Sequence, residues 1–188
     1  MTTTPSTVVF PKSIWAETAP PRTQTQPLKG TLDADTVIVG GGLSGLSAAL
    51  HLARRGQKVV LLEAMAVGWG ASGRNNGQVI PTMTAAEPDA LAKRYGEAGE
   101  RFARLIGNSA SVLFDLVREE GMAAEAEQAG WFQPAHSPGR MRLSKMRVDA
   151  WKRFGFPARL LDRDECRALL GSDFWYGGMF NPTGGHVN

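Results

Sequence analysis

The chain has 188 residues, of which 43% are hydrophobic and 21% are charged, and its formal net charge at pH 7 is +3. This composition is that of a globular protein and excludes a disordered one, and the length predicts one domain, or one and part of a second. The small net charge is scattered along the sequence and gives no basis for expecting nucleic-acid binding. A lone cysteine, Cys166, excludes an internal disulfide framework and is typical of a reducing compartment, so we expect a cytoplasmic protein.

Residues 1–32 are rich in Pro, Thr and Gln and have no sustained period, which predicts an arm over the surface, tethered by Trp15. They contain no apolar stretch after a basic start, so no signal peptide is expected. The longest apolar stretch, Thr36 to Ala53, is interrupted by glycines and serines. We therefore expect no transmembrane segment.

A strand, a helix and a second strand are predicted next, in that order. The short apolar stretch Thr36–Val39 predicts a buried strand, and Lys58–Leu62 is apolar enough to be buried on both faces, as parallel strands are. Between them, a helix from about Leu43 to Arg55 has apolar residues at spacings of three and four and ends before Gly56. This order indicates a βαβ unit and an α/β fold. The helix residues expected to face the sheet are Leu46, Ala49, Leu50 and Ala53.

Beyond a second glycine-rich stretch, the pattern alternates between helices and strands. The pair Asp162 and Glu165 has the spacing of a capping box, which predicts the start of the helix that carries Cys166 by ordinary packing. The cations between Arg140 and Arg153 predict a solvated helix face. Large aromatic residues such as Phe174, Trp175 and Tyr176 are expected in the core or half-buried. The predicted elements are helices at Pro88–Gly107, Ser109–Glu120, Ser137–Phe154 and Asp162–Leu170, and strands at Trp131–Ala135 and Phe174–Phe180.

The turn after the first strand contains the spacing Gly40-x-Gly42-x-x-Gly45, followed after the second strand by Glu63. Gly40 permits a tight turn, Gly42 lets the backbone approach a pyrophosphate, and Gly45 lets the helix lie close to the strands. The helix N-terminus offers free amides and a positive dipole to the phosphates. Glu63 can accept hydrogen bonds from an adenosine ribose and would repel a 2′-phosphate. The residues assigned to the dinucleotide here are Gly40, Gly42, Leu43, Ser44, Gly45, Glu63 and Ala64.

This fingerprint does not separate NAD from FAD, and the second glycine segment, Gly68 to Gln78, decides between them. The segment is either a flexible loop or a backbone-lined turn over the second phosphate and the flavin, and we favour the turn. The amides and Ser72 would face the anion, and amide side chains would meet a polar ring edge. Arg74 either neutralises phosphate or pairs with a surface acid. The residues assigned to FAD here are Gly70, Ala71, Ser72, Arg74, Asn75, Asn76, Gly77 and Gln78.

At this point the sequence resembles a known family. The stretch LDADTVIVGGGLSGLSAALHLARRGQKVVLLEAMAVGWGASGRNNGQ is similar to the D-amino-acid oxidase (DAO) superfamily of FAD-dependent oxidoreductases, and most of all to gamma-glutamylputrescine oxidases. The segments SIWAETAPP and GGHVN extend the resemblance from Ser13 to Asn188. The resemblance implies FAD, oxidation of a C–N bond of an amine or amino acid by hydride transfer to flavin, imine hydrolysis, and reoxidation by oxygen or another acceptor.

Two features depart from the family. Asn76 stands where the family commonly has glycine, and family members are about twice as long. We therefore expect an inactive N-terminal fragment, with an incomplete FAD-binding Rossmann-like domain and the beginning of an α+β substrate domain. The expected organisation is an arm over 1–32, the FAD-binding βαβ unit over 33–78, a helical region over 79–125 and the start of the substrate domain over 126–188.

No catalytic residue can be assigned from the sequence. His51, His136 and His186 have no partner at ligand spacing, no pattern suggests a metal site, and no Gly-x-Ser-x-Gly elbow supports acyl transfer.

Two other functions remain open. One is an NAD-linked dehydrogenase, against which the second glycine segment argues. The other is a non-catalytic remnant that binds a nucleotide or joins a partner.

Overall fold

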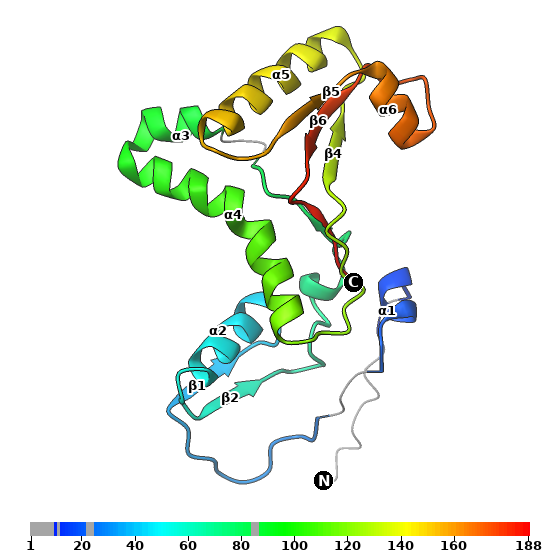
Figure 1. Cartoon of the computed structure of the whole chain (residues 1–188). Coiled ribbons are helices and arrows are strands. Elements are labelled where there is room, and N and C mark those ends of the chain that lie inside the picture. The colour runs from blue at the N-terminus through cyan, green and yellow to red at the C-terminus, as the bar shows by residue number, and fades with distance from the viewer. Residues whose placement is uncertain (1–9, 11, 22–24, 84–86) are drawn as a thin grey trace. The chain divides into compact units, whose positions relative to one another are not determined.

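The computed structural model describes residues 10, 12–21, 25–83 and 87–188. They form a mixed α/β structure with two compact units, Met1–Asn76 and Gly77–Asn188 (Figure 1). The elements are α1 (Ile14–Thr18), β1 (Thr36–Val39), α2 (Leu43–Ala53), β2 (Val59–Leu62), the 3-10 turn η1 (Ala71–Gly73), β3 (Gln78–Val79), α3 (Pro88–Tyr95), α4 (Glu97–Glu119), β4 (Trp131–Pro134), α5 (Pro138–Arg153), β5 (Arg159–Leu161), α6 (Arg163–Leu170), β6 (Gly178–Asn181) and β7 (Gly185–His186).

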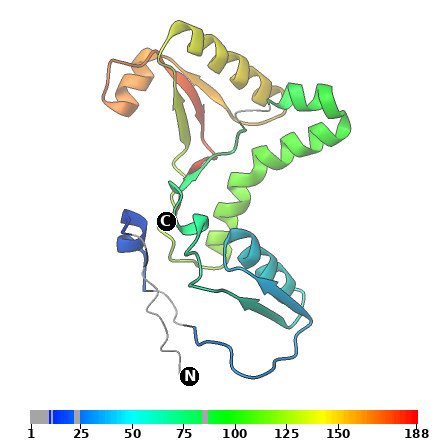
Figure 2. The ribbon, with the colours of Figure 1, turned by 180° about the vertical axis from the view of Figure 1, so that it is seen from behind.

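The first unit is built on a βαβ motif, as predicted. Strands β1 and β2 pair in parallel, with Thr36 opposite Val59 and Val39 opposite Leu62. Helix α2 connects them and covers one face of the pair, as the view from behind shows (Figure 2). Because the glycine turn joins β1 to α2 and Glu63 directly follows β2, the motif fixes where those residues lie.

The burial of this motif differs from the prediction. Val37 and Val39 are 57% and 85% exposed, so within the described residues no element covers the second face of β1. Leu46 and Ala53 are exposed, so their predicted position against the sheet is wrong. Gly45 lies close to β1, and this contact turns the helix so that residues four and seven positions later share its inner face. Those residues, Ala49 and Leu52, are half-buried.

Part of the predicted arm, residues 1–9, 11 and 22–24, lies outside the described residues. In the rest, α1 is a short helix that begins at the N-cap Ser13, whose hydroxyl accepts a hydrogen bond from the amide of Ala16. Trp15 lies on this helix and is half-buried. Its role as a tether stays a prediction.

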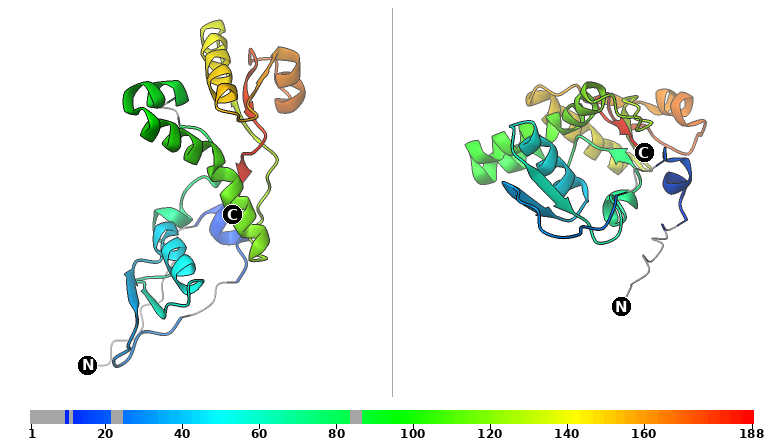
Figure 3. Two further views of the ribbon diagram at one scale, coloured as in Figure 1. Left: turned by 60° about the vertical axis from the view of Figure 1, so that its left-hand side comes forward. Right: turned by 90° about the horizontal axis from the view of Figure 1, so that it is seen from below.

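The second unit carries the hydrophobic core. Its central sheet has the order β4-β6-β5 with antiparallel pairing, and α5 lies along one face (Figure 3). Trp151 on α5 is fully buried against Met179 on β6, and Phe156 meets its ring edge-on at a centroid distance of 5.5 Å. The aromatic edge-to-face contact and the buried area together stabilise the packing of helix on sheet.

The two predicted helices before this sheet exist, but their boundary is elsewhere. The chain breaks at Gly96, with a φ of 55°, and then α4 runs without interruption through Gly107. A glycine conformation in the left-handed region ends α3 and lets the chain turn into α4. Gly107 interrupts nothing because its missing side chain makes room for Phe156, whose Cζ would lie 2.3 Å from an added Cβ.

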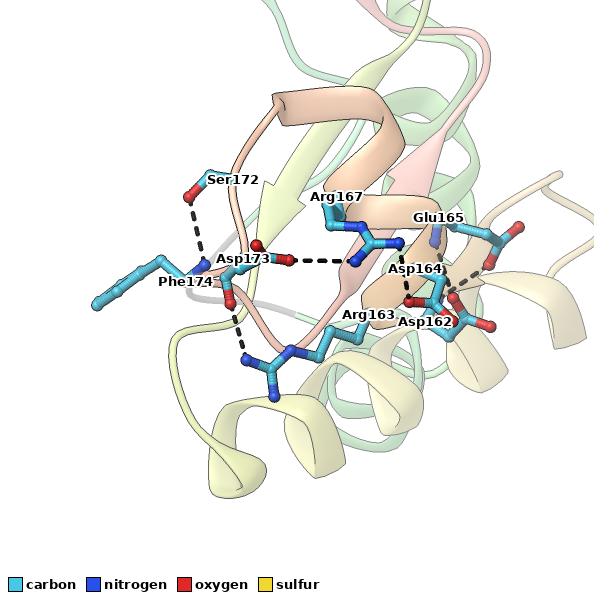
Figure 4. Close-up of polar contacts among 8 residues, drawn as sticks. All are labelled: Asp162, Arg163, Asp164, Glu165, Arg167, Ser172, Asp173 and Phe174. Carbon is cyan, nitrogen blue, oxygen red and sulfur yellow. Dashed lines mark hydrogen bonds and ion pairs between the residues drawn. The ribbon is translucent and has the colours of Figure 1, made fainter.

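Helix α6 begins and ends as predicted (Figure 4). The carboxylate of Asp162 accepts from the amide of Glu165, and the carboxylate of Glu165 accepts from the amide of Asp162, both at 2.9 Å. The helix stops at Gly171, which has a left-handed backbone. Cys166 is fully buried in this helix, and burial raises the pKa of its thiol. It is therefore a packing residue, as expected.

The last strand is shorter than predicted, and only its end pairs with the sheet, over Gly178–Asn181. Phe174 and Tyr176, which precede it, are exposed rather than core residues, so that part of the prediction is wrong. Phe174 instead stacks edge-on against Trp175, and Arg163 lies over the ring of Tyr176. None of the described helices combines the length and apolar character that crossing a membrane requires.

Candidate cofactor site

The glycine turn after β1 has the geometry that the fingerprint requires. Gly40 has a φ of 104°, which side chains rarely tolerate. A Cβ on Gly45 would lie 2.0 Å from the carbonyl oxygen of Gly40, so only glycine fits there. Gly42 is the N-cap of α2, and a Cβ at that position would lie 3.0 Å from the hydroxyl of Ser72. The turn therefore presents bare backbone at the start of the helix.

The first turn of α2 has the features that suit an anion. The first N–H groups of a helix have no partner inside it, and the helix dipole places a partial positive charge at this end. The first turn contains Leu43 and Ser44 and no acidic residue. The amide of Leu43 donates to the hydroxyl oxygen of Ser72 at 3.0 Å. Because a hydroxyl can accept and donate at once, Ser72 can pass a hydrogen bond from this amide to an anion.

Glu63 lies beside the turn at the end of β2. Its Oε1 accepts from the amide of Met65 at 2.9 Å and its Oε2 accepts from the amide of Gly41 at 2.6 Å. These two bonds, with a smaller contribution from the amide of Ala64, hold the pKa of the carboxyl below its usual value. The carboxylate is therefore ionised at neutral pH and can accept hydrogen bonds from ribose hydroxyls. Its charge would repel a 2′-phosphate.

The second glycine segment is tied to the first turn at two points. The amide of Gly68 donates to the carbonyl of Gly41 at 2.9 Å, and Ser72 bonds Leu43 as described above. Within the segment, the side-chain amide of Asn75 donates to the carbonyl of Ser72 at 2.9 Å. Of the two predictions for this segment, the ordered turn fits these contacts better than the flexible loop.

Arg74 does not pair with an acid within the part of the chain that the structure describes. Its Nε donates to the carbonyl of Gly70 at 3.3 Å, and its guanidinium lies over the ring of Trp69, 4.6 Å from the centroid. Two alternatives were predicted for Arg74, a contact with phosphate and a surface ion pair. The described structure does not show the surface ion pair. The stacking partner, Trp69, is one that the sequence did not suggest.

The last residues predicted for the site are divided between the two units. Asn76 ends the first unit and is exposed. Gly77 and Gln78 begin the second unit, where the side-chain oxygen of Gln78 accepts from the indole N–H of Trp131 at 3.1 Å. Their predicted contact with a flavin ring stays a prediction. Gln78 also starts β3, which pairs with β7.

Two residues of this site were missed from the sequence. Gly41 was read only as a spacer, yet its amide binds Glu63 and its carbonyl binds Gly68. The signal was present, since three consecutive glycines follow β1. Trp69 gave no signal beyond being a large aromatic residue among glycines.

The histidines do not belong to a cluster of metal-binding side chains in the described part of the chain. The described residues contain no group of three or more His, Cys, Asp or Glu side chains placed to hold a metal ion. His186 does have a partner that the sequence did not reveal, since its Nε2 lies 3.8 Å from a carboxylate oxygen of Glu127. A β-bridge between the same two residues explains why they meet.

The donors gathered in the first unit fit the ADP half of a dinucleotide. Helix amides and a hydroxyl suit a diphosphate, an ionised carboxylate suits ribose hydroxyls, and the bare glycine backbone leaves space for close approach. The residues that carry this fit are Gly40, Gly42, Leu43, Gly45, Glu63 and Ser72.

Comparisons with known proteins agree with this interpretation. The sequence model of the family described as "FAD dependent oxidoreductase" (DAO) matches residues 35–188. The chain is 30% identical over 163 residues to gamma-glutamylputrescine oxidoreductase of Escherichia coli, covering 86% of this chain and 38% of that protein. It is 34% identical over 170 residues to the probable oxidoreductase OrdL of Haemophilus influenzae, covering 88% of this chain and 38% of the relative.

Solved structures show the same fold. Glycine oxidase from Geobacillus kaustophilus superimposes with a TM-score of 0.67 at 21% identity, over 82% of this chain and 40% of that one. L-amino acid deaminase from Proteus myxofaciens gives a TM-score of 0.69 at 22% identity, over 87% of this chain and 35% of the other. The chain thus spans 35–40% of the length of these structures and 38% of the two curated relatives.

Proposed function

The chain belongs to the DAO family of FAD-dependent oxidoreductases, and we propose that it forms the ADP-binding part of an enzyme that oxidises a C–N bond of an amine or amino acid. FAD is the cofactor of this family. The observation that carries the proposal is the tie between the two glycine segments, in which Ser72 meets the first amide of α2 beside the ionised Glu63.

Each residue of the site has a distinct task in this proposal. The amides at the start of α2 and the hydroxyl of Ser72 hold the diphosphate, and Glu63 holds the adenosine ribose. The remaining residues of the second glycine segment line the path toward the flavin. By this arrangement the chain positions the cofactor.

When bound, FAD supplies the acceptor for the hydride that leaves the carbon of the C–N bond. The amine loses this hydride and one proton, which leaves an imine, and water then hydrolyses the imine to a carbonyl compound and an amine or ammonia. The bound cofactor would supply the route by which the two electrons reach oxygen or another acceptor. The residues of this chain orient the cofactor for the transfer, and we assign none of them a catalytic role.

The domain organisation follows the same proposal. We place the FAD-binding βαβ unit at 33–78, a helical region at 79–125 and the start of the substrate domain at 126–188, after an arm over 1–32. The boundary between the two compact units, after Asn76, supports the first division. The antiparallel sheet β4-β6-β5 supports the last one, since it is separate from the parallel pair.

The substrate class is proposed from the relatives. Gamma-glutamylputrescine oxidoreductase, glycine oxidase and L-amino acid deaminase are names of proteins that act on amines or amino acids. We propose a primary amine of the gamma-glutamylputrescine type first and a simple amino acid second, because the relatives that match by sequence include the former.

The first test uses the protein purified at the length that its host makes. We expect the purified protein to show flavin absorption bands and to release FAD when it is denatured. We also expect it to produce peroxide or to reduce a dye when gamma-glutamylputrescine, other amines or amino acids are added. A protein that carries a nicotinamide dinucleotide instead, or that binds neither dinucleotide, would contradict the proposal.

Substitution of Gly42 by valine tests the site directly. The side chain would occupy the space where a pyrophosphate approaches the backbone, so Gly42→Val is expected to abolish flavin binding. The fold should change little, because the nearest obstacle to the new Cβ is the flexible side chain of Ser72. Flavin content and circular dichroism measure the two effects.

A matched control is available on α5. Gly139→Val adds the same side chain where the nearest heavy atoms lie 3.9 Å from the new Cβ, so flavin content should stay at the wild-type level. Normal flavin content in Gly42→Val, with correct folding, would refute the assignment of the site.

A further inference from the structure

We propose that Trp69 and Arg74 form a brace that holds residues 68–76 in the conformation that receives the diphosphate of the cofactor. The inference deepens the proposed function and rests on it. It assigns Arg74 a positioning role through Trp69, in place of direct neutralisation of phosphate.

The brace closes the segment across its glycines. The Arg74 guanidinium lies over the indole of Trp69, at 4.6 Å from the ring centroid, and its Nε holds the carbonyl of Gly70 at 3.3 Å. The two side chains therefore join the beginning of the segment to its end, on either side of η1. A cation over an indole face is attracted by the ring quadrupole, and tryptophan is the best ring for this contact.

The glycine content of the segment explains why such a contact is useful. Three of the residues in 68–73 are glycine, which lose more conformational freedom on ordering than other residues. Its internal backbone bonds include those of a 3-10 turn, from Gly73 to Gly70 at 3.2 Å and from Arg74 to Ala71 at 3.1 Å. The brace spans this turn and limits the positions that its backbone can take.

The braced turn positions Ser72. Ser72 lies at the middle of η1, and its hydroxyl meets the first amide of α2. Gly73 fits the turn tightly, since a Cβ there would lie 2.1 Å from the carbonyl oxygen of Gly68. Release of the brace lets the turn open, and Ser72 then leaves the helix N-terminus. Loss of this preorganised contact weakens the binding of an anion at that position.

Limited proteolysis tests the brace without the cofactor. Trypsin cleaves after Arg74, and opening of the segment exposes that bond. In the cofactor-free protein, at the length its host makes, Trp69→Leu is expected to raise the rate of cleavage between Arg74 and Asn75 about two- to fivefold, as expected for an exposed cation–π contact. Trp69→Phe keeps an aromatic face and should restore most of the protection.

A matched control removes the same kind of contact elsewhere. Tyr176 lies under the guanidinium of Arg163, with a centroid distance of 5.4 Å, in the second unit. Tyr176→Leu should leave cleavage after Arg74 at the wild-type rate. An equal rate in Trp69→Leu and wild type would overturn the brace.

FAD affinity, measured by quenching of flavin fluorescence, distinguishes positioning from direct contact. In a double-mutant cycle, Trp69→Leu and Arg74→Gln should each weaken FAD binding about two- to fivefold, and the double variant should bind no worse than either single one. If Arg74 neutralised phosphate directly, Arg74→Gln would weaken binding while Trp69→Leu would not. That result would overturn the positioning role.

The two proposals fail in different ways. If the wild-type protein binds no FAD, the proposed function is wrong, and cleavage after Arg74 still decides whether the brace exists. If the wild-type protein binds FAD but Trp69→Leu changes neither the cleavage rate nor the affinity, the brace is wrong and the proposed function stands.

Discussion

Glu63 is held by backbone amides, and this makes its contribution to stability depend on pH. The amides of Met65 and Gly41 lower the pKa of the carboxyl in the folded state below its ordinary value of 4.5. A group whose pKa is lower in the folded state stabilises the fold above the unfolded pKa, and this contribution is lost as the pH falls through the folded pKa. The acid side of the stability curve should therefore report on Glu63.

Glu63→Gln removes the titrating group while keeping a similar shape. We expect the variant to be less stable than the wild type at neutral pH, with a difference that shrinks as the pH falls below about 4.5. Urea unfolding at a series of pH values measures this difference. A difference that stays constant across the whole acid range would show that the carboxylate charge does not contribute. The same variant should weaken FAD binding less than Gly42→Val, because one hydrogen-bonding group is altered and no space is filled.

At the scale of single residues, sequence spacing was sufficient where a residue type has one well-defined role in the motif. Gly40, Gly45 and Glu63 were assigned from spacing. The turn has the geometry that calls for glycine at the first two positions, and the contact of all three residues with a dinucleotide stays a prediction. The contact between Trp69 and Arg74 could not be predicted, because it depends on the path of a segment with no secondary-structure period. Side-chain partners across such a turn are set by its three-dimensional course and not by spacing.

Between elements, two ion pairs connect the start of α3 to α5. Arg147 donates from Nε to Glu87 at 2.5 Å, and Arg153 pairs with Asp89. The Arg147 side chain is only 6% exposed, so the predicted solvated face is wrong at this residue. The other cations of the run are exposed, as predicted. Burial raises the pKa of Glu87, against the effect of Arg147.

Breaking the ion pair between Glu87 and Arg147 should destabilise the fold, whereas replacing both residues by apolar ones should destabilise it much less. Removal of one partner leaves an uncompensated buried charge, so Glu87→Leu is expected to lower the free energy of unfolding by about 3–5 kcal/mol. The pair also leaves two buried polar atoms, Oε2 of Glu87 and Nη2 of Arg147, without a hydrogen-bond partner in the described part of the chain. The double variant Glu87→Leu/Arg147→Met should therefore recover most of the loss, as measured by urea unfolding.

A surface pair on the same helix is the control. Lys145 and Asp149 are one turn apart and exposed, so Lys145→Met should change the free energy of unfolding by less than about 0.5 kcal/mol. A double variant as unstable as the sum of its two single variants would show that Glu87 and Arg147 do not act as a pair.

Elements with a clear period or cap were predicted well, and short elements were not. The capping box fixed the start of α6, and Ser137 fixed the start of α5. Strands β5 and β7 were missed, because Arg159–Leu161 and Gly185–His186 are too short to show an alternating pattern. The break between α3 and α4 was misplaced, because a glycine in a helix either ends it or makes room for a neighbour, and spacing does not distinguish these roles.

Across the whole molecule, the buried hydrophobic residues are unevenly distributed between the two units. The fully buried hydrophobic residues, such as Trp151 and Met179, lie in Gly77–Asn188, and among the described residues of Met1–Asn76 no hydrophobic side chain is buried. The sequence predicted a buried strand at Thr36–Val39 and a strand buried on both faces at Lys58–Leu62. Parallel strands reach that state only when helices cover both sides of the sheet, and here α2 covers one side.

This imbalance predicts how the 188-residue polypeptide behaves when it is prepared alone. Val37 and Val39 present an apolar face, and β1 and β2 each leave one edge unpaired within the described residues, which favours association between copies. We therefore expect the polypeptide to self-associate, to retain little FAD and to produce no peroxide from gamma-glutamylputrescine. Size-exclusion chromatography with light scattering, flavin absorption and a peroxide assay measure the three properties.

The cause of the self-association can be tested on the strand itself. Val39 is 85% exposed, so Val39→Lys places a charge on the apolar face without displacing a core residue. It should reduce association, whereas Val112→Lys, at an exposed position of α4, should not. If the unmodified polypeptide is monomeric and turns over substrate, then the uncovered face of β1 is compatible with a working enzyme. In that case α2 and the glycine turn suffice to hold the cofactor without a second layer on the sheet.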